Sequence, residues 1–489
     1  MTISEMKEKT MNRIRESKGT VFLAFIMAMV LVSPLWAAES YKKIDAVTLQ
    51  KYKGWLDDPR PSTKELAYSK ILPAEVYAKL TWDMPTMKKA WADVVGFAAP
   101  DAVGKVASEI KPGKYSYKDM ETNPALKELV IPYFRDHFFK PAGPPLIGNF
   151  SEVTVIPTRQ FYFPLPVSQA TKKNSGKTRL DDKGYIIDSS YEAGIPFPQP
   201  TGKFKAQQVV YNWIKRYWEA ESSDSVGQFK GFNRHLKMDF DGVIEIKTLK
   251  LAGRCVIPPF GYLDDRARQR KEETALLLTY LAPRDQYGTA LNVLSYEAAD
   301  SFDSMTLYIN ALRRLRKLSA TDSQDALGGQ DIIMDDNNGF GKLCSTRNQY
   351  KVEILAEREY LVPFTTDGSL YFSSKGMELK NVEVERRPMY VIKMTQLDKN
   401  YVYSYRIAYF DRETFILYHI ENYDQKGRLY RTNTSFTTFV PEMGMTTQRM
   451  VISRDHIDLH SSLALPFITP VVNLKRSDVG LEGLIGKGK

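Results

Sequence analysis

The chain has 489 residues, of which 43% are hydrophobic and 12% aromatic, so it can form two or three folded domains or one large β domain with an appendage. Its 68 Lys and Arg and 58 Asp and Glu residues give a formal net charge of +10, with both signs spread along the sequence. This mixture is typical of a solvated surface, with attraction to anionic lipid as the alternative, and we expect no nucleic-acid partner.

The N-terminus has the three-part pattern of an export signal. Basic residues between Lys7 and Lys18 precede the apolar run Val21–Val32, and Ser33-Pro34 ends this run before Ala37-Ala38. The run is much shorter than the about twenty residues that a membrane-spanning helix needs. We therefore predict a cleavable signal peptide over residues 1–37, with an uncleaved N-terminal anchor as the alternative.

The remaining chain divides into three parts by composition. Residues 38–150 combine helical spacing of apolar residues with frequent prolines, which predicts a helical and irregular N-terminal segment. Residues 151–464 contain many short runs rich in aromatic and β-branched residues, and we predict a mostly β (α+β) domain there. Residues 465–489 are predicted to form an irregular tail.

One amphipathic helix is predicted inside the β domain, between Thr201 and Ser222. Its apolar residues recur at helical spacing and include Trp213 and Tyr217. We expect this helix to pack on a sheet face; a helix lying on a membrane surface is the alternative.

The stretch Pro388–Phe439 has the firmest β pattern. Its aromatic and β-branched runs are separated by the turn sequences DKN, DRET and DQKG, which predicts a four-stranded antiparallel meander. Alternation along the second run places Tyr403 and Tyr405 on one face, and the third run adds Tyr418 to an aromatic surface. This surface is either the packed core of the sheet or partly the lining of a site for an apolar molecule.

Two clusters of charged or metal-ligating residues lie on predicted strands. A last strand is predicted at Gln448–Leu459. If it extends to His460, then His456, Asp458 and His460 share one face, where they could bind a divalent metal or simply face solvent. The basic residues Arg313, Arg314 and Arg316 lie in a predicted strand over Ser304–Leu318. They form either a solvated strand and turn or a contact for lipid headgroups or an acidic partner.

Other candidate chemistry is limited. Asp335 and Asp336 lie on a polar stretch that we predict to be a loop rather than an acid–base or calcium site. Cys255 and Cys344 are the only cysteines, and they either form one disulfide or remain buried thiols. Phosphate-loop, dinucleotide-turn and nucleophile-elbow motifs are absent from the sequence, and we predict no cofactor.

A set of short motifs occurs in a fixed order between residues 150 and 450. They are IPTRQ at 156–160, AGIPFP at 193–198, LYINALRRLR at 307–316, DDNNGF at 335–340, RPMYV at 387–391 and YDQKGRLYR at 423–431. Together they resemble a family of Gram-negative envelope proteins of unknown function that is related to the outer-membrane lipoprotein-sorting proteins LolA and LolB. The chain departs from the family pattern at Asn310-Ala311, where the family often has Pro-Gly.

The resemblance implies a strongly curved, unclosed antiparallel β-barrel with helices packed in its concave side. It also implies a periplasmic protein that works with a resistance-nodulation-type exporter of lipids or sterols, or with an outer-membrane partner. In the sorting proteins the concavity holds acyl chains.

We therefore predict a non-enzymatic carrier of a lipid or other apolar molecule that makes transient contact with a membrane surface. The expected ligand contacts are Trp213, Tyr217, Tyr403, Tyr405 and Tyr418. The alternatives are a metal-dependent hydrolase that uses His456, Asp458 and His460, or a ligand-free scaffold of an export complex.

Overall fold

The computed structural model describes residues 67–187, 190–217, 220–298, 301–318, 350–366 and 370–481, together with Gln324, Ile333 and Asp336. The predicted signal peptide lies outside the described residues. In the described part the helices are α5 (Tyr68–Ile71), α6 (Ala74–Lys79), α7 (Met84–Val95), α8 (Ala99–Ala102), α9 (Tyr117–Thr122), α10 (Pro124–Leu129), α11 (Pro132–His137), α12 (Leu165–Asn174), α13 (Lys205–Lys215) and α14 (Asp265–Arg270). None of these is long and apolar enough to cross a membrane.

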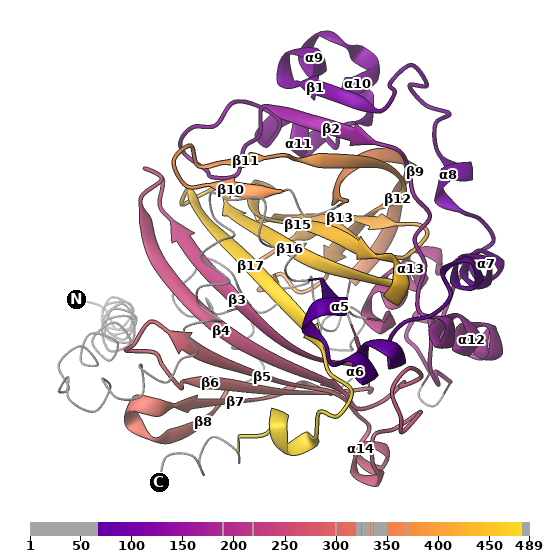
Figure 1. Ribbon diagram of the computed structural model, residues 1–489. Coiled ribbons are helices and arrows are strands. Elements are labelled where there is room, and N and C mark those ends of the chain that lie inside the picture. Colours follow the sequence, from indigo (N-terminus) through magenta and orange to yellow (C-terminus); the bar gives the residue numbers. More distant parts are fainter. Residues whose placement is uncertain are drawn as a thin grey trace, which may run out of the picture.

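Most of the strands belong to one large sheet (Figure 1). Its order in the described chain is β1-β2-β12-β13-β14-β15-β16-β17-β3-β4-β5-β6-β7-β8, with β9 pairing to β12 and β15. The strands before residue 320 are β1 (Gly113–Ser116), β2 (Glu152–Ile156), β3 (Ser222–Phe232), β4 (Met238–Lys250), β5 (Glu272–Ala282), β6 (Ala290–Tyr296), β7 (Ser304–Ile309) and β8 (Arg314–Leu318). The later strands are β9 (Tyr350–Thr365), β10 (Tyr371–Ser373), β11 (Glu378–Lys380), β12 (Glu383–Gln396), β13 (Tyr405–Asp411), β14 (Leu417–Tyr423), β15 (Leu429–Val440), β16 (Met445–Asp455) and β17 (His460–Pro470).

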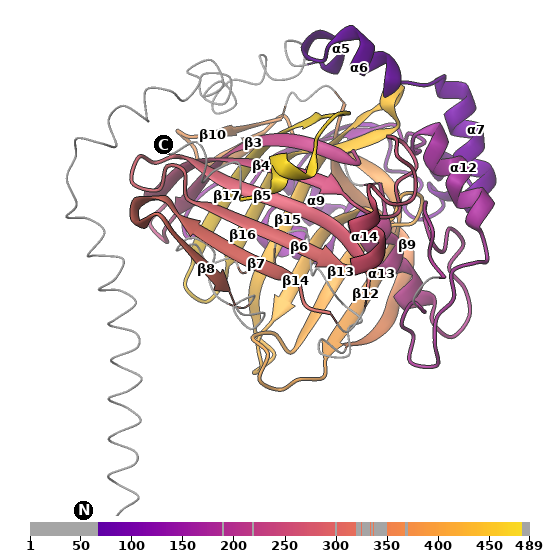
Figure 2. The ribbon, with the colours of Figure 1, turned by 90° about the horizontal axis from the view of Figure 1, so that it is seen from below.

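The predicted fold class is confirmed. The sheet is almost entirely antiparallel and strongly curved, and Figure 2 shows β5–β8 in front of β12–β16, so that the two ends of the sheet stand opposite each other across an interior. The predicted meander is also confirmed, because β12, β13, β14 and β15 follow one another as antiparallel neighbours.

The two faces of the meander contact different helices. On β13, Phe410 packs edge-on against Trp213 of α13, with ring centroids 6.2 Å apart. The preceding residue, Tyr409, pairs directly with His419 of β14, whose ring stacks on Tyr133 of α11. Because neighbouring residues of a strand point to opposite faces, α13 and α11 lie on opposite sides of the sheet. We call the side of α13 the inner face and the side of α11 the outer face.

The strand register carries these faces across the whole sheet, since directly paired residues share a face. From the meander, the inner face passes through the pairs Ile420–Asn433, Asn433–Ser453, Ser453–Ser462 and Ser462–Gly231 into β3. Beyond β3, the inner face continues through Ile246 of β4 toward β8, while Leu249 and Leu277 point outward. These outer residues contact Val479 in a C-terminal 3-10 helix at Arg476–Val479.

The N-terminal segment is fixed to the meander by buried charge. Arg387 of β12 is fully buried and donates to Asp411 Oδ2 at 2.7 Å and to Glu413 Oε2 at 2.6 Å. Glu413 also accepts hydrogen bonds from the backbone N–H groups of Ala99 and Phe161, each at 2.8 Å. The second predicted turn of the meander, DRET, is therefore an anchor for the preceding chain. Its acidic residues hold the preceding chain against the meander.

Three predicted boundaries differ in the structure. The predicted helix Thr201–Ser222 covers only Lys205–Lys215, so Tyr217 follows it. The predicted strand Ser304–Leu318 is a hairpin, because the chain turns at Asn310–Leu312 and Arg313 adopts a left-handed conformation with φ 51°. Strand β17 continues to Pro470, so the sheet extends beyond residue 464, and the segment predicted to be an irregular tail also contains the 3-10 helix.

Candidate ligand-binding face

The predicted helix contacts lie in closed packing. Trp213 is 4% exposed, and Val209 and Val210 on the same helix are fully buried between α13 and the core. Tyr217 is also buried, and burial together with the neighbouring Glu221 carboxylate raises the pKa of its phenol well above the usual value. In the described structure, α13 is an element of the core, and a ligand could reach these side chains only after the helix moved.

The three predicted meander tyrosines lie in different surroundings. Tyr403 precedes β13, and its hydroxyl group donates to both carboxylate oxygens of Asp336 at 2.7 and 2.8 Å. Tyr405 lies on the outer face, where its ring stacks on Tyr423 with centroids 4.4 Å apart. Tyr418 is fully buried in the main core. The structure does not bring these tyrosines to one site, and their role as ligand contacts stays a prediction.

The strand face that His456, Asp458 and His460 were expected to share is not formed. Strand β16 ends at Asp455 and β17 begins at His460, so His456 and Asp458 lie in the turn between them. His456 turns toward the outer face, whereas the Nε2 atom of His460 lies 3.2 Å from a carboxylate oxygen of Asp239. Across the described ranges, no three His, Cys, Asp or Glu side chains are grouped to hold a metal ion.

On the outer face, three histidines instead surround Tyr133 of α11. The Tyr133 ring lies 4.5 Å from that of His419 and 4.8 Å from that of His137, and its hydroxyl oxygen lies 3.0 Å from His456 Nε2. Burial, together with the nearby charges of His137 and Arg454, lowers the pKa of His456 to about 3. The pKa of His419 is also held well below its usual value by burial. These neutral rings pack α11 against β14–β16.

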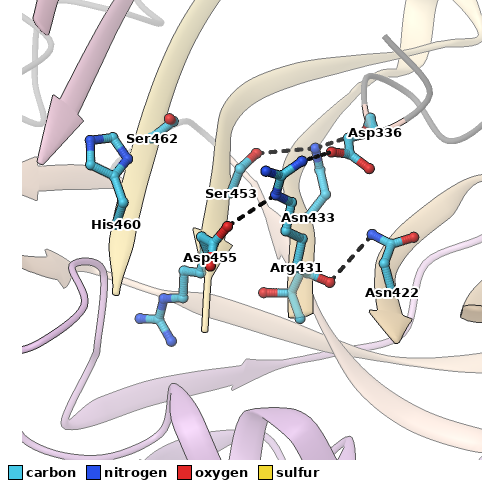
Figure 3. Close-up of a pocket in the computed structure, with 10 residues that line it drawn as sticks. Asp336, Asn422, Arg431, Asn433, Ser453, Asp455, His460 and Ser462 are labelled. Atoms are coloured by element: carbon cyan, nitrogen blue, oxygen red, sulfur yellow. Dashed lines mark hydrogen bonds and ion pairs between the residues drawn. The ribbon is translucent and has the colours of Figure 1, made fainter. Parts of the chain in front are cut away.

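A small polar pocket lies on the inner face of β14–β17 (Figure 3). Arg431 donates from Nε to Asp455 at 3.1 Å and forms an ion pair with Asp336 at 3.6 Å, while Asn433 links the Asp336 backbone to Ser453. The pocket is lined by Asp336, Asn422, Arg431, Thr432, Asn433, Ser453, Arg454, Asp455, His460 and Ser462.

This network holds Asp336 against the sheet. Asp336 belongs to a stretch predicted to be a polar loop, yet its side chain is buried, and burial raises the pKa of its carboxyl group. The charges of the pocket largely satisfy one another, so the pocket itself offers few free groups to a ligand.

A different feature occupies the inner face of β4–β8. Here aliphatic side chains pair directly across neighbouring strands, in one row from Ile246 through Leu278 and Leu291 to Leu307 and in a second row from Leu276 through Val293 and Met305 to Leu318. We call these residues the aliphatic face.

Six of them form a hydrophobic cluster of their own, separate from the main core. In the described part of the chain, this cluster contains only residues of β5–β8: Leu276, Leu278, Leu291, Val293, Met305 and Leu318. A sheet normally buries its apolar face against a second layer. The described residues contribute no apolar side chain from a second layer to this cluster.

The basic residues predicted as a partner contact border the aliphatic face. Arg316 pairs directly with Leu307, and Arg314 pairs with Ile309, so both lie on the inner face of β8. Both side chains are exposed. Arg313 lies in the turn between β7 and β8 and is exposed as well. A contact with lipid headgroups or an acidic partner remains a prediction for these three residues.

The predicted disulfide cannot be placed, because Cys344 lies outside the described residues. Cys255 carries a free thiol in the described structure. Burial, with the adjacent Glu221 carboxylate, raises the pKa of this thiol to about 12. The protonated form dominates at neutral pH, so Cys255 should react slowly with thiol reagents.

The aliphatic face was missed in the sequence because its strands are apolar on both sides. The run ALLLTYLA at 275–282 places Leu276 and Leu278 inward and Ala275 and Leu277 outward, so alternation does not single out one face. The available signal was the absence of acidic residues from 274 to 282, a span of largely apolar residues. Cross-strand register was needed to show which side chains meet.

A strongly curved, mostly antiparallel sheet, with α13 on its inner face and α11 on its outer face, defines an α+β half-barrel protein. Within that class, the chain belongs to the family described as proteins of unknown function, DUF1329, whose model matches residues 146–465. No curated protein matches the chain.

Several solved structures are similar to the chain. A domain of the outer membrane lipoprotein-sorting type from Vibrio parahaemolyticus is 17% identical, with a TM-score of 0.38, and the match covers 54% of this chain and 91% of that one. A DUF1329 family protein from Desulfovibrio piger is also 17% identical, with a TM-score of 0.38, over 54% of this chain and 90% of that one. A LolA superfamily protein from Nitrosomonas europaea is 13% identical, with a TM-score of 0.36, over 57% of this chain and 98% of that one.

Proposed function

We propose that the protein is a periplasmic carrier of a lipid or another apolar molecule, which binds on the aliphatic face of β4–β8. The observation that supports this proposal is the separate cluster on β5–β8, to which the described residues add no apolar side chain from a second layer. Its members Leu291, Val293 and Met305 are buried. Burial of a methylene group contributes about 0.8 kcal/mol. An acyl chain lying along two rows of aliphatic side chains therefore has several kcal/mol of gross driving force before the cost of ordering it.

The curvature of the sheet favours this position over a flat surface. Because β5–β8 stand opposite β12–β16 across the interior, a molecule on the aliphatic face lies inside the curve of the sheet (Figure 2). The inner face also changes character along its length, from polar side chains on β14–β17 to aliphatic ones on β4–β8. An amphiphile fits such a division better than a wholly apolar molecule.

Burial gives affinity but no direction of transfer, because a ligand shifts an equilibrium only through differential interactions. The proposal therefore includes a partner that accepts or delivers the ligand. The motif resemblance supports a resistance-nodulation-type exporter or an outer-membrane partner in this role.

The test is native mass spectrometry of the protein purified from its own periplasm, combined with a variant of the aliphatic face. We expect co-purifying lipid with the wild type and at least fivefold less with Leu278→Gln. Leu315→Gln is the matched control, since Leu315 is 51% exposed on the outer side of β8 and its loss should not change the bound lipid.

Circular dichroism must show that both variants fold. Wild-type protein without any bound lipid would refute the carrier and favour the scaffold alternative. Equal lipid in the two folded variants would refute the aliphatic face as the binding site.

A further inference from the structure

The aliphatic face ends at two arginines, and this arrangement bears on the chemistry of the carried molecule. The row Ile246, Leu278, Leu291 and Leu307 continues on the next strand with Arg316. Four strand spacings of about 4.8 Å place Arg316 about 19 Å from Ile246. A long acyl chain laid across the strands would thus place its polar end beside the guanidinium group.

The charge around these arginines is not balanced locally. The strand segments that carry the two aliphatic rows, 274–282, 290–296, 304–309 and 314–318, include no acidic residue. Glu273, at the bulge where β5 begins, is already paired with Lys215 of α13. Neither Arg314 nor Arg316 has an ion-pair partner among the described residues, and both side chains are exposed at the edge of the described sheet. A phosphate or carboxylate group at this edge would meet two guanidinium groups that donate charge-assisted hydrogen bonds.

We infer that the carried molecule is an anionic amphiphile, whose apolar chain lies on the aliphatic face and whose acidic headgroup lies between Arg314 and Arg316. This inference rests on the proposed function and narrows its substrate class. It follows from the placement of both features on one face of adjacent strands, with the aliphatic rows running directly into the arginines.

Basic residues on an edge strand also have a structural use, because charge at a sheet edge discourages pairing with another chain. That role does not depend on the face of the strand. Lys317 therefore provides an internal comparison: it is exposed on the same strand but pairs with Thr306, which points to the outer face. A headgroup site requires Arg314 and Arg316 but not Lys317.

The experiment uses the full mature chain after removal of bound lipid. The protein is incubated with an equimolar mixture of phosphatidylglycerol and phosphatidylcholine that have identical acyl chains, and the bound lipid is quantified by native mass spectrometry. Each basic residue close to an anionic headgroup contributes about fivefold. We expect the wild type to prefer phosphatidylglycerol by about tenfold or more, and Arg314→Gln/Arg316→Gln to retain total lipid but lose most of this preference.

Lys317→Gln should keep the wild-type preference, and Leu278→Gln should lose both lipids. Equal binding of the two lipids by the wild type would overturn the anionic headgroup site while leaving the carrier proposal intact. The same loss of preference in Lys317→Gln would assign the effect to net charge and would also overturn it. Binding of neither lipid by the wild type would count against the carrier proposal itself.

Cosedimentation with phosphatidylglycerol vesicles separates a bound headgroup from surface attachment. If the double variant lost vesicle binding but kept its preference for phosphatidylglycerol as a bound ligand, the arginines would serve a membrane contact, and the inference would be wrong.

Discussion

Acid should weaken the contact between α11 and the sheet through His456, and the size of the effect follows from its burial. The pKa of this residue falls from 6.5 to about 3 on folding. Below pH 6.5 the unfolded chain therefore binds a proton that the folded chain excludes, so stability falls as the pH falls toward 3. At pH 5, which is about 1.5 units below the pKa of the unfolded chain, the loss of stability from this one residue amounts to about 2 kcal/mol.

The assay compares the unfolding free energy of the wild type and His456→Gln in guanidinium chloride at pH 7.5 and pH 5. A glutamine amide can replace the Nε2 contacts to Tyr133 and Thr432, which lie at 3.0 and 3.3 Å, but it does not titrate. We expect the variant to lose about 2 kcal/mol less than the wild type between the two pH values. The comparison is needed because buried carboxyl groups such as Glu413, with a pKa raised to about 7, act in the opposite direction.

The exposed His235 supplies the control. It lies in the turn between β3 and β4, and His235→Gln should lose as much stability on acidification as the wild type. An equal pH dependence in the wild type and His456→Gln would refute the reasoning, since it would mean that His456 is protonated as readily in the folded chain as in the unfolded one.

Three further predictions concern packing and reactivity. Trp91→Ala removes a fully buried indole that docks α7 on the meander. It should cost about 3–5 kcal/mol in chemical denaturation and expose the N-terminal segment to protease. Met84→Ala on the same helix, at a position 43% exposed, should cost under about 0.5 kcal/mol. Gly194 has φ +84°, and Gly194→Ala would place a Cβ atom 2.6 Å from a backbone nitrogen of α12. This variant should lower the thermal midpoint far more than Gly202→Ala, because Gly202 has φ +71° but open space around it. Similar midpoints would contradict the steric argument. With the other cysteine replaced by serine, Cys255 should remain unmodified by Ellman's reagent at pH 8 until urea is added, and rapid labelling of the native protein would show that its thiol is accessible.

The meander is the part of the fold that local sequence patterns predict best. Turn sequences rich in Asp, Asn and Gly set the strand limits, and short turns leave antiparallel pairing as the only option. The same information was insufficient between Ser304 and Leu318, where Asn310-Ala311 lacks a strong turn signal and the chain nevertheless reverses at a left-handed Arg313. It was insufficient again at Tyr403, which precedes β13 and is held by Asp336 from a distant part of the chain.

The candidate site depended on information that no local pattern contains. His456 and His460 have the spacing of ligands on one strand face, but the turn after Asp455 sends them to opposite sides of the sheet. Asp411 and Glu413 were predicted only as turn residues, but both are paired with the buried Arg387, and Glu413 also binds the backbone N–H of Ala99 in the N-terminal segment. In each case the role of a polar side chain was decided by a partner far away in sequence.

The sequence by itself determined that the protein is mostly β, that its meander is antiparallel and that a separate helix has one apolar side, because periodicity and turn chemistry act over a few residues. Only the tertiary structure decided which side chains share the interior of the curve. The strands β4–β8 are apolar on both sides, and pairing registers between strands are set by long-range packing rather than by alternation. Those registers place the aliphatic face beside Arg314 and Arg316. The tyrosines of the meander, which the sequence singled out, lie elsewhere.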